Sequence, residues 1–275
     1  MSAEAVPAGA VPAQVAVQRG GRVAVQPDWL ADEVPVALVV GGVSQAVMLA
    51  TPADLDDFAL GFALTEGWIA DAGELYAVEA QHTPQGIELR LEVAAARQWA
   101  LRERRRALAG RTGCGLCGID SLAGLERPLA GVQPPALRPG ALARAQRELG
   151  QRQPLNALTG AMHAAAWCGA DGAVQRVRED IGRHNALDKL VGALARAGID
   201  PSAGFVAITS RASYEMVHKA ASAGVGLLAA VSAPTARAVQ TADRCGLALA
   251  GFVRGDDAVF YGSVAALQPP LGAAA

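Results

Sequence analysis

The sequence predicts an α/β (α+β) protein with two domains, an N-terminal mixed domain and a C-terminal sheet with helices packed on its faces. About half of the 275 residues are apolar, which is enough to bury a sizeable core. From about residue 155, segments typical of strands alternate with segments typical of helices. Residues 128–140 contain four prolines, which indicates a linker between the two halves.

This pattern divides the chain into four parts. Residues 1–25 are rich in Ala, Val, Pro and Gln with little patterning, and we interpret them as a flexible tail. Residues 26–127 are expected to form the N-terminal α+β domain, which ends in a segment with two cysteines. The linker follows at 128–140, and residues 141–275 are expected to form the C-terminal domain.

The N-terminal domain begins with a predicted β-hairpin. Two runs rich in β-branched residues, 34–40 and 43–49, flank Gly41-Gly42, a dipeptide typical of tight hairpin turns. A helix is expected next, because Thr51 can cap it, Pro52 fits its first position, and apolar residues then recur at helical spacing. The pattern further predicts strands at 75–81 and 87–93 and a helix at 95–109.

The C-terminal domain shows a regular alternation of elements. Glycines follow several of its helical segments, as is common where a helix ends in a left-handed residue. The periodicity predicts helices at 141–149, 159–168, 185–197, 213–223 and 235–244. It predicts strands at 173–178, 205–209, 225–231, 247–253 and 259–261.

Charge and composition exclude several classes of partner. The net charge is -2, which argues against broad binding to nucleic acid or to a membrane surface. Few residues are aromatic, so a base-stacking platform for single-stranded nucleic acid is not expected. No apolar run reaches the ~18 residues of a membrane span. Four cysteines are too few for a disulfide framework in so long a chain, and we expect a cytoplasmic protein with reduced thiols.

One segment carries two closely spaced thiols. Residues 113–118 read Gly-Cys-Gly-Leu-Cys-Gly, and glycine at this density disfavours both helix and strand. We therefore expect an exposed, mobile loop that presents Cys114 and Cys117. Positive charge nearby lowers a thiol pKa from its reference of ~8.5 and populates the nucleophilic thiolate. Such charge precedes the loop as Arg102, Arg104, Arg105, Arg106 and Arg111.

Polar residues of the C-terminal half follow the ends of its predicted strands. If the strands are parallel, these segments meet at one edge of the sheet, where open α/β sheets bind ligands. Helix N-termini and arginines there suit phosphate, so we expect a phosphorylated, nucleotide-like ligand. No glycine-rich dinucleotide fingerprint or Walker loop identifies it further. The segments are Asp180 to Asn185, which includes Arg183 and His184, then Ser210-Arg211, Ser232 to Thr235 and Arg254 to Asp257.

Seven blocks of the chain, taken in order, resemble the FdhD family, the sulfurtransferases that serve formate dehydrogenase. Because seven blocks recur in sequence, the resemblance is specific, and it covers nearly everything from about residue 34 to 262. The blocks are TPADLDDFALGFALTEGWI (51–69), CGLCG (114–118), LTGAMHAAA (158–166), EDIGRHNALDKLVGALARAG (179–198), RASYEMVHKAA (211–221), VSAPTARAV (231–239) and GFVRG (251–255).

The resemblance implies a function and a set of partners. Proteins of this family accept sulfur from a cysteine desulfurase as a persulfide. They pass it to the molybdenum bis-molybdopterin guanine dinucleotide cofactor before that cofactor enters formate dehydrogenase. The family's persulfide role maps onto Cys114, and Cys117 can resolve the persulfide or assist transfer through a transient disulfide. The resemblance also implies a homodimer and a C-terminal three-layer α/β/α domain similar to the cytidine-deaminase-like fold.

A ligand site follows from the same resemblance. The family's cofactor-binding segment maps onto Phe252, Val253, Arg254, Gly255, Asp256 and Asp257. Together with Arg183, His184, Ser210 and Arg211, these residues are the expected site, and GDP is the expected mimic of the cofactor. Residues 209–211 read Thr-Ser-Arg where the family has Ser-Gly-Arg. Ser210 therefore has a β-carbon where glycine would allow a ligand to approach closely.

The cysteines also admit a different interpretation. Cys114 and Cys117 have the spacing of half a zinc site, which Cys168, Cys245 or a histidine would have to complete. The protein would then be a non-catalytic chaperone that binds the molybdenum cofactor and delivers it. We expect instead that no metal is bound and that Cys168 and Cys245 are buried packing thiols. An active deaminase is rejected, because the sequence contains no H-x-E motif.

Several other polar residues have structural interpretations. His184 can cap a helix, and His163 and His218 fall within predicted helices. Asp188 and Lys189 are compatible with an exposed helix face. Glu215 and Lys219 have the spacing of a surface ion pair.

Overall fold

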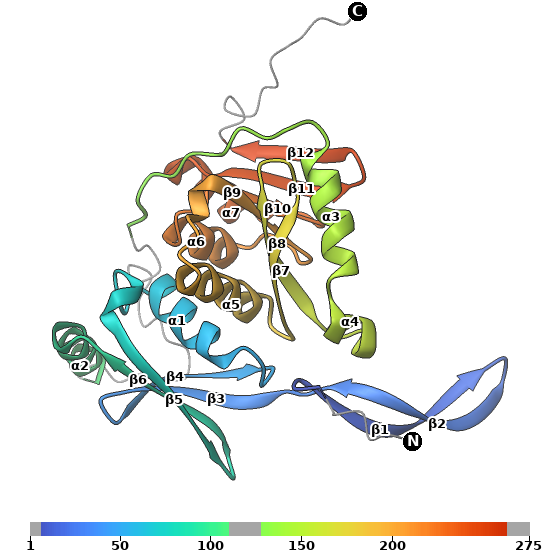
Figure 1. Ribbon diagram of the computed structural model, residues 1–275, viewed down its shortest axis with the longest axis horizontal. Helices are drawn as coiled ribbons and strands as arrows, with labels where there is room; N and C mark the ends of the chain where they lie inside the picture. The colour runs from blue at the N-terminus through green and yellow to red at the C-terminus, as the bar shows by residue number, and fades with distance from the viewer. Residues whose placement is uncertain (1–6, 110–127, 263–275) are drawn as a thin grey trace, which may run out of the picture.

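The computed structural model describes residues 7–109 and 128–262. It contains a two-stranded arm and a four-stranded sheet from the N-terminal half, and a six-stranded sheet from the C-terminal half (Figure 1). Helices pack between the two sheets and on the outer face of the larger one (Figure 1). The predicted mixed α/β class is confirmed, whereas the cytidine-deaminase-like detail stays a prediction.

The N-terminal sheet has the strand order β4-β3-β6-β5. β3 pairs in parallel with β6, and the outer pairs are antiparallel. Helix α1 covers one face, so that Phe58 of the helix packs with Val36 and Leu89 of the strands. The elements are β3 (Val34–Val40), β4 (Val43–Ala50), α1 (Leu55–Thr65), η1 (Ala72–Glu74), β5 (Leu75–Thr83), β6 (Gly86–Val93) and α2 (Ala95–Ala109).

The C-terminal sheet has the strand order β12-β11-β10-β9-β7-β8. Its helices are α3 (Ala141–Gln151), α4 (Pro154–Thr159), α5 (Arg183–Arg196), α6 (Tyr214–Ser222) and α7 (Ala236–Cys245), with the 3-10 helix η3 (Pro201–Ala203). Its strands are β7 (His163–Gly169), β8 (Val174–Asp180), β9 (Gly204–Ile208), β10 (Leu227–Ala230), β11 (Ala248–Arg254) and β12 (Asp257–Gly262).

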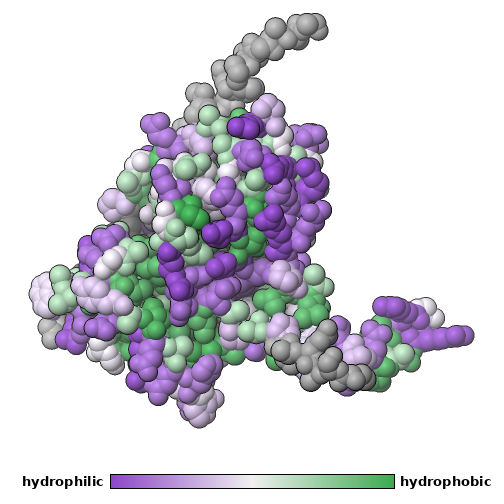
Figure 2. Space-filling model, in the orientation of Figure 1, coloured by the Kyte–Doolittle hydropathy of each residue, from purple (hydrophilic) through white to green (hydrophobic). Residues whose placement is uncertain are grey.

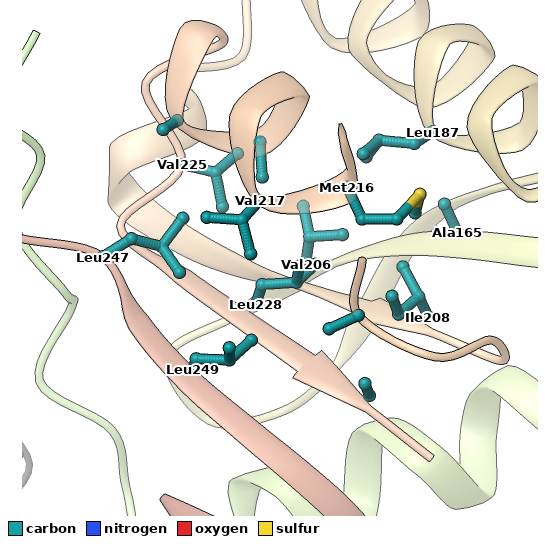
Figure 3. Packing of buried hydrophobic residues seen from close by; sticks show 14 of the residues in the cluster. Ala165, Leu187, Val206, Ile208, Met216, Val217, Val225, Leu228, Leu247 and Leu249 are labelled. Carbon is teal, nitrogen blue, oxygen red and sulfur yellow. The ribbon is translucent and has the colours of Figure 1, made fainter. Parts of the chain in front are cut away.

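Two apolar clusters cover the two faces of this sheet. On one face, alternate strand residues such as Val206 and Leu228 pack against Leu187 of α5 and Met216 of α6 (Figure 3). On the other face, residues such as Phe205 pack against the buried side of α3. The central strands are therefore buried on both sides, which is typical of a sheet covered by helices.

The two halves meet where α1 crosses α5. Both helices carry a glycine at the contact, and neither position has room for a side chain. A β-carbon on Gly61 would lie 1.7 Å from the carbonyl oxygen of Asp188, and one on Gly192 would lie 1.9 Å from that of Asp57. Glycine at both positions therefore lets the two backbones approach, and the N-terminal sheet is held against the C-terminal domain through this contact.

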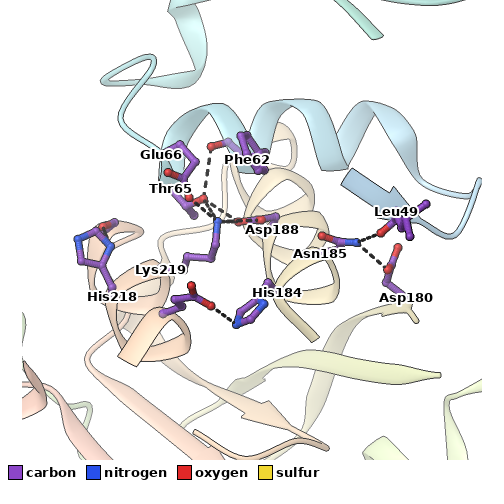
Figure 4. Close-up of polar contacts among 12 residues, drawn as sticks. Leu49, Phe62, Thr65, Glu66, Asp180, His184, Asn185, Asp188, His218 and Lys219 are labelled. Carbon is purple, nitrogen blue, oxygen red and sulfur yellow. Dashed lines mark hydrogen bonds and ion pairs between the residues drawn. The ribbon is translucent and has the colours of Figure 1, made fainter. Parts of the chain in front are cut away.

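Two buried lysines reinforce the same junction through hydrogen bonds to the N-terminal half. The Nζ of Lys189 lies 2.7 Å from Asp180 and donates to the carbonyl oxygen of Thr51 at 2.9 Å. The Nζ of Lys219 lies 2.9 Å from Asp188 and donates to the hydroxyl oxygen of Thr65 at 3.1 Å (Figure 4). The predicted exposed positions are therefore wrong for Asp188, Lys189 and Lys219. Each is at most 7% exposed, and α5 is buried around nearly its whole circumference.

The N-terminal tail is a correction to the sequence analysis. Residues 10–31 form an antiparallel hairpin, β1 (Ala10–Arg19) and β2 (Arg22–Ala31), instead of part of a flexible tail at 1–25. Its two-residue turn is Gly20-Gly21, with φ of 57° and 79°. Such angles match the turns that favour right-twisted hairpins, so Gly20-Gly21 is a hairpin signal of the same kind as Gly41-Gly42.

Two further element predictions are wrong. The predicted helix at 159–168 is the strand β7, preceded by the short helix α4. Periodicity alone cannot assign a buried apolar run to helix or strand. This segment is a strand because it pairs with both β8 and β9. Thr51 does not cap α1, which begins at Leu55. The Thr51 backbone N–H instead donates to Asp180 at 3.0 Å, and its hydroxyl accepts from the N–H of Ile181 at 3.2 Å.

Candidate functional site

The carboxyl ends of four strands of the large sheet meet at one edge. β9, β10 and β11 are mutually parallel. β7 is antiparallel to both β9 and β8, so β8 runs in the same direction as β9. The segments that follow β8, β9, β10 and β11 therefore lie along one edge, together with the start of β7. This is the arrangement that the sequence analysis expected, and we call it the carboxyl edge.

Backbone contacts join neighbouring loops along this edge. The N–H of Thr235 donates to the carbonyl oxygen of Ala212 at 3.0 Å, beside a bridge between Ala212 and Pro234. The N–H of Phe252 donates to the carbonyl oxygen of Ser232 at 3.3 Å. The loops after β9 and β10 and the end of β11 are thus joined by backbone hydrogen bonds.

The start of α5 is arranged to favour an anion. Gly182 precedes the helix and offers no side chain to cap it. The carboxylate of Asp180 accepts from the N–H of Gly182 at 2.8 Å and from Asn185 at 3.0 Å, which fixes the turn, while Lys189 balances its charge. Free N–H groups and the helix dipole then face the edge. The Nε of Arg183 is buried there and has no partner among the described residues.

His184 and Glu215 connect the starts of α5 and α6. The Nε2 of His184 lies 2.7 Å from a carboxylate oxygen of Glu215, and this contact lowers the pKa of Glu215 (Figure 4). Ser213, which precedes α6, makes no side-chain capping bond to the helix. Two helix starts therefore lie side by side at the edge. The predicted surface pair of Glu215 with Lys219 is replaced by this contact with His184.

His163 is a residue that the sequence analysis missed at this edge. It is the first residue of β7, and its Nδ1 lies 3.5 Å from the hydroxyl oxygen of Thr209. Burial lowers the pKa of His163, as does the positive charge of Arg183. The predicted helix at 159–168 gives no reason to place this histidine beside Arg183. Only the correct strand assignment puts it there.

The segment from Phe252 to Asp257 comprises the end of β11, the turn at Gly255-Asp256 and the first residue of β12. The strand register shifts here, which marks a β-bulge, and Phe252 adopts a left-handed φ of 53° with 40% of its surface exposed. Arg254, Gly255, Asp256 and Asp257 are exposed. The side chain of Val253 is buried in the core, so it can meet a ligand only through its backbone.

Ser210 and Arg211 occupy the loop after β9. The hydroxyl of Ser210 donates to the carbonyl oxygen of Arg211 at 3.0 Å. Because Ser210 is buried, this hydrogen bond stabilises the loop itself. The side chain of Arg211 is exposed and free to reach a ligand. The structure thus brings Arg183, His184 and Arg211 to the carboxyl edge with the 252–257 segment.

Cys114 and Cys117 lie outside the described residues. The other two cysteines are buried, as predicted. Cys168 packs on the α3 face of the sheet and Cys245 on the opposite face, so the two cannot share a metal ion. Burial raises the pKa of Cys168 to about 12, and it also raises the pKa of Cys245. Neither thiol is suited to nucleophilic chemistry.

Two hollows of the described surface lie at opposite ends of α6. A cavity of about 240 Å³ lies between α6 and α7 and is lined by Tyr214, His218 and Arg244, with Pro128 and Leu129. Pro128 is where the described chain resumes after the two cysteines. A second, more open hollow lies at the opposite end of α6, beside Ala221 and Gly224.

Comparison with known proteins agrees with this architecture. A sulfur carrier protein FdhD from Variovorax paradoxus is 56% identical over 235 residues, which cover 85% of this chain and 84% of that protein. One from Chromobacterium violaceum is 52% identical over 242 residues, 86% and 90% of the two chains. The crystal structure of a formate dehydrogenase accessory protein from Desulfotalea psychrophila shares the fold, with a TM-score of 0.72 at 23% identity over 92% of this chain and 97% of that one.

Fold and site together define an α/β protein whose carboxyl edge is suited to a phosphorylated ligand. The model of the FdhD/NarQ family matches residues 31–267, and the chain belongs to that family. This confirms the resemblance on which the sequence analysis relied. Among the described helices, none has the length and apolar character needed to cross a membrane.

Proposed function

We propose that this protein is a sulfur carrier that serves formate dehydrogenase and that Cys114 carries the sulfur as a persulfide. The proposal rests on two features that occur together in this chain. A glycine-flanked pair of cysteines follows an arginine-rich helix, and a separate sheet edge is suited to phosphate. The names of the curated relatives support the sulfur carrier role.

Loading of Cys114 with sulfur requires one reaction of the thiol–disulfide exchange type. The Cys114 thiolate attacks the outer, sulfane sulfur of a persulfide on a cysteine desulfurase. The bond between that sulfur and the donor cysteine breaks, and the donor leaves as a thiolate. A low pKa of Cys114, favoured by the preceding arginines, populates the attacking thiolate. Cys114 then holds the persulfide.

Discharge requires two electrons, because sulfane sulfur must become sulfide. The Cys117 thiolate supplies them by attacking the inner sulfur, the Sγ of Cys114. A disulfide between Cys114 and Cys117 forms, and hydrosulfide leaves. The hydrosulfide replaces an oxygen of the molybdenum substrate, and that oxygen takes up one further proton from solvent and leaves as water. Two equivalents of a cellular thiol then reduce the disulfide, form a disulfide with each other, and restore both cysteines.

The acceptor in this proposal is the molybdenum bis-molybdopterin guanine dinucleotide cofactor, as substrate. Its phosphates suit the start of α5 and the arginines Arg183, Arg211 and Arg254. Its guanine suits the exposed ring of Phe252. His184, held by Glu215, can contact the same ligand.

We also propose that the protein is a cytoplasmic homodimer that meets the desulfurase and formate dehydrogenase in turn.

A Cys114→Ala variant tests the thiol role. It should abolish maturation of formate dehydrogenase in cells that lack the native protein, while GDP binding measured by calorimetry stays unchanged. Loss of both properties would indicate a folding defect. Normal maturation would contradict the persulfide role and favour the non-catalytic cofactor chaperone.

An Arg254→Ala variant tests the ligand edge. Loss of a charge-assisted hydrogen bond to phosphate should weaken GDP binding about tenfold, without affecting persulfide loading. Arg176→Ala is the control, because Arg176 is an exposed arginine within β8 that bonds only its neighbour's carbonyl among the described residues. Equal GDP affinity in both variants and the native protein would contradict the proposed site.

A further inference from the structure

Helix α2 concentrates positive charge in a chain whose net charge is -2. Its sequence contains five arginines and one glutamate, which gives the helix a net charge of +4. The Nε of Arg97, in its first turn, lies 2.9 Å from a carboxylate oxygen of Glu74. Arg102 is exposed and forms no ion pair within the described part of the chain. The remaining arginines of the helix are Arg104, Arg105 and Arg106.

The described side chains of α2 anchor the helix on one side only. The helix stands at one end of the N-terminal sheet, at the margin of the molecule, where the surface mixes hydrophobic and hydrophilic residues (Figures 1 and 2). Among those side chains, Leu101 alone belongs to the buried cluster of that sheet. Trp99 precedes Leu101 by two residues, so it lies on the opposite side of the helix, and it is 65% exposed.

The two most exposed aromatic side chains among the described residues both belong to this end of the N-terminal domain. Besides Trp99, Tyr76 is 64% exposed. Tyr76 follows Glu74 by two residues, and the carbonyl oxygen of Glu74 accepts from the N–H of Ala94, directly before α2, at 2.8 Å. Trp, Tyr and Arg are the residues most enriched in protein–protein interfaces. Exposed rings beside a strongly basic helix are therefore typical of a surface that binds an acidic protein surface.

This surface lies within reach of the thiol that carries sulfur in the proposed function. Cys114 follows Ala109, the last residue of α2, by five residues. Five extended residues span at most about 18 Å, which limits the distance between the backbone of Cys114 and the end of the helix. Trp99 lies about 15 Å along the helix from Ala109. A protein bound to α2 is thus close enough to meet Cys114.

We propose that α2 is the docking surface for the persulfide donor, which presents an acidic surface to Trp99 and Arg102. The inference rests on the proposed sulfur carrier function, in which a cysteine desulfurase loads Cys114. The indole ring of Trp99 loses exposed apolar area on docking, while Arg102 and the charge of the helix attract the acidic surface and speed the encounter. Because salt screens exposed charges, the docking is sensitive to ionic strength.

The kinetics of loading test this docking surface. The full chain is incubated with cysteine and a purified cysteine desulfurase well below saturation, and intact-protein mass spectrometry follows the gain of one sulfur atom. Trp99→Ala and Arg102→Glu should each be loaded at least about tenfold more slowly than the native protein. Added salt should slow the loading of the native protein more than that of Arg102→Glu.

Glutathione persulfide separates docking from the reactivity of the thiol, because this small donor needs no docking surface. It should load both variants at the native rate, and both variants should keep the native midpoint of thermal unfolding. Arg176→Glu is the matched control for the charge reversal, because Arg176 is exposed on β8 in the other half of the molecule. The desulfurase should load this control as fast as the native protein.

Variants of Trp99 and Arg102 that the desulfurase loads at the native rate would overturn the proposal. An equal slowing with glutathione persulfide would also overturn it, because the defect would then lie at Cys114. If Trp99→Ala does not fold, Arg102→Glu alone decides. A native protein loaded by glutathione persulfide but not by the desulfurase would contradict docking and leave the persulfide role intact. A native protein that gains sulfur from neither donor would contradict the sulfur carrier function itself, and docking with it.

Discussion

Phe252 is the residue whose backbone most directly suggests a ligand. A left-handed φ is unfavourable for a bulky side chain, and such strain persists where the surrounding structure enforces it, commonly at ligand sites. The preceding residue, Gly251, packs closely on the loop after β10, where a β-carbon would lie 3.0 Å from Pro234. The bulge thus holds the ring of Phe252 out at the carboxyl edge, where the proposed guanine needs a flat apolar surface.

Replacing Phe252 with glycine should separate stability from binding. Glycine adopts φ of 53° without strain, so Phe252→Gly should raise the free energy of unfolding by about 1 kcal/mol in urea titrations. The same variant loses the ring, and stacking on an aromatic is worth about 1–3 kcal/mol per base, so GDP binding should weaken roughly tenfold or more.

Asp54→Gly provides the matched comparison. Asp54 has the only other positive φ of a non-glycine residue in the described chain, and it precedes α1. Its change to glycine should relieve strain and leave GDP affinity unaltered. If Phe252→Gly binds GDP as well as the native protein, Phe252 does not contact the base.

Sequence reasoning places at the carboxyl edge those candidate residues that share a local pattern. Arg183 and His184 follow a strand and open a helix, and both features are visible along the chain. It misses His163, Asp188 and Lys219, whose roles depend on segments far apart in sequence. Asp188 and Lys219 are polar residues within mainly apolar helices. That signal favours buried pairing, but the sequence alone does not identify the partner.

The contact of α1 with α5 is the element that fixes the two halves together. Gly61→Ala should be strongly destabilising, because the new methyl group would overlap backbone atoms that cannot move independently. We expect the free energy of unfolding to fall by about 3 kcal/mol, the upper range for overpacking. Chemical denaturation measures this, and loss of the α1–α5 junction should also reduce the maturation activity.

For Gly150→Ala we predict a change in the free energy of unfolding of the opposite sign. Gly150 also lies within a helix, α3, but a β-carbon added there would have no other atom within 4 Å. Alanine should therefore stabilise the helix by about 0.5–1 kcal/mol. Similar effects of the two substitutions would contradict the close approach of α1 and α5.

Most elements with clear periodicity are predictable from the sequence, whereas the strand β7 and the β1–β2 arm are not. The helices at 185–197 and 235–244 carry apolar stripes and glycine ends, and the structure has them within a few residues. The β7 segment is predicted as a helix because its Ala-rich run favours helix locally, whereas its position between β8 and β9 decides otherwise. The arm escapes prediction because neither of its faces is uniformly apolar.

At the scale of the whole molecule, the proposed chemistry is divided between the two halves. The cysteine pair belongs to the N-terminal half of the sequence, and the carboxyl edge belongs to the C-terminal half. Lys189 and Lys219 join these halves, because their Nζ atoms bond Thr51, Thr65 and Glu66 of the N-terminal half. In the proposal the edge binds the phosphorylated acceptor, and Cys168 and Cys245 are too buried to act on it.

Intact-protein mass spectrometry tests the central claim most directly. The native protein is incubated with a cysteine desulfurase and cysteine, then measured before and after treatment with a reductant. The account predicts a gain of one sulfur atom that the reductant removes, retained in Cys117→Ala and absent in Cys114→Ala. A native protein that gains no sulfur, or a Cys114→Ala variant that gains as much as the native protein, would contradict it.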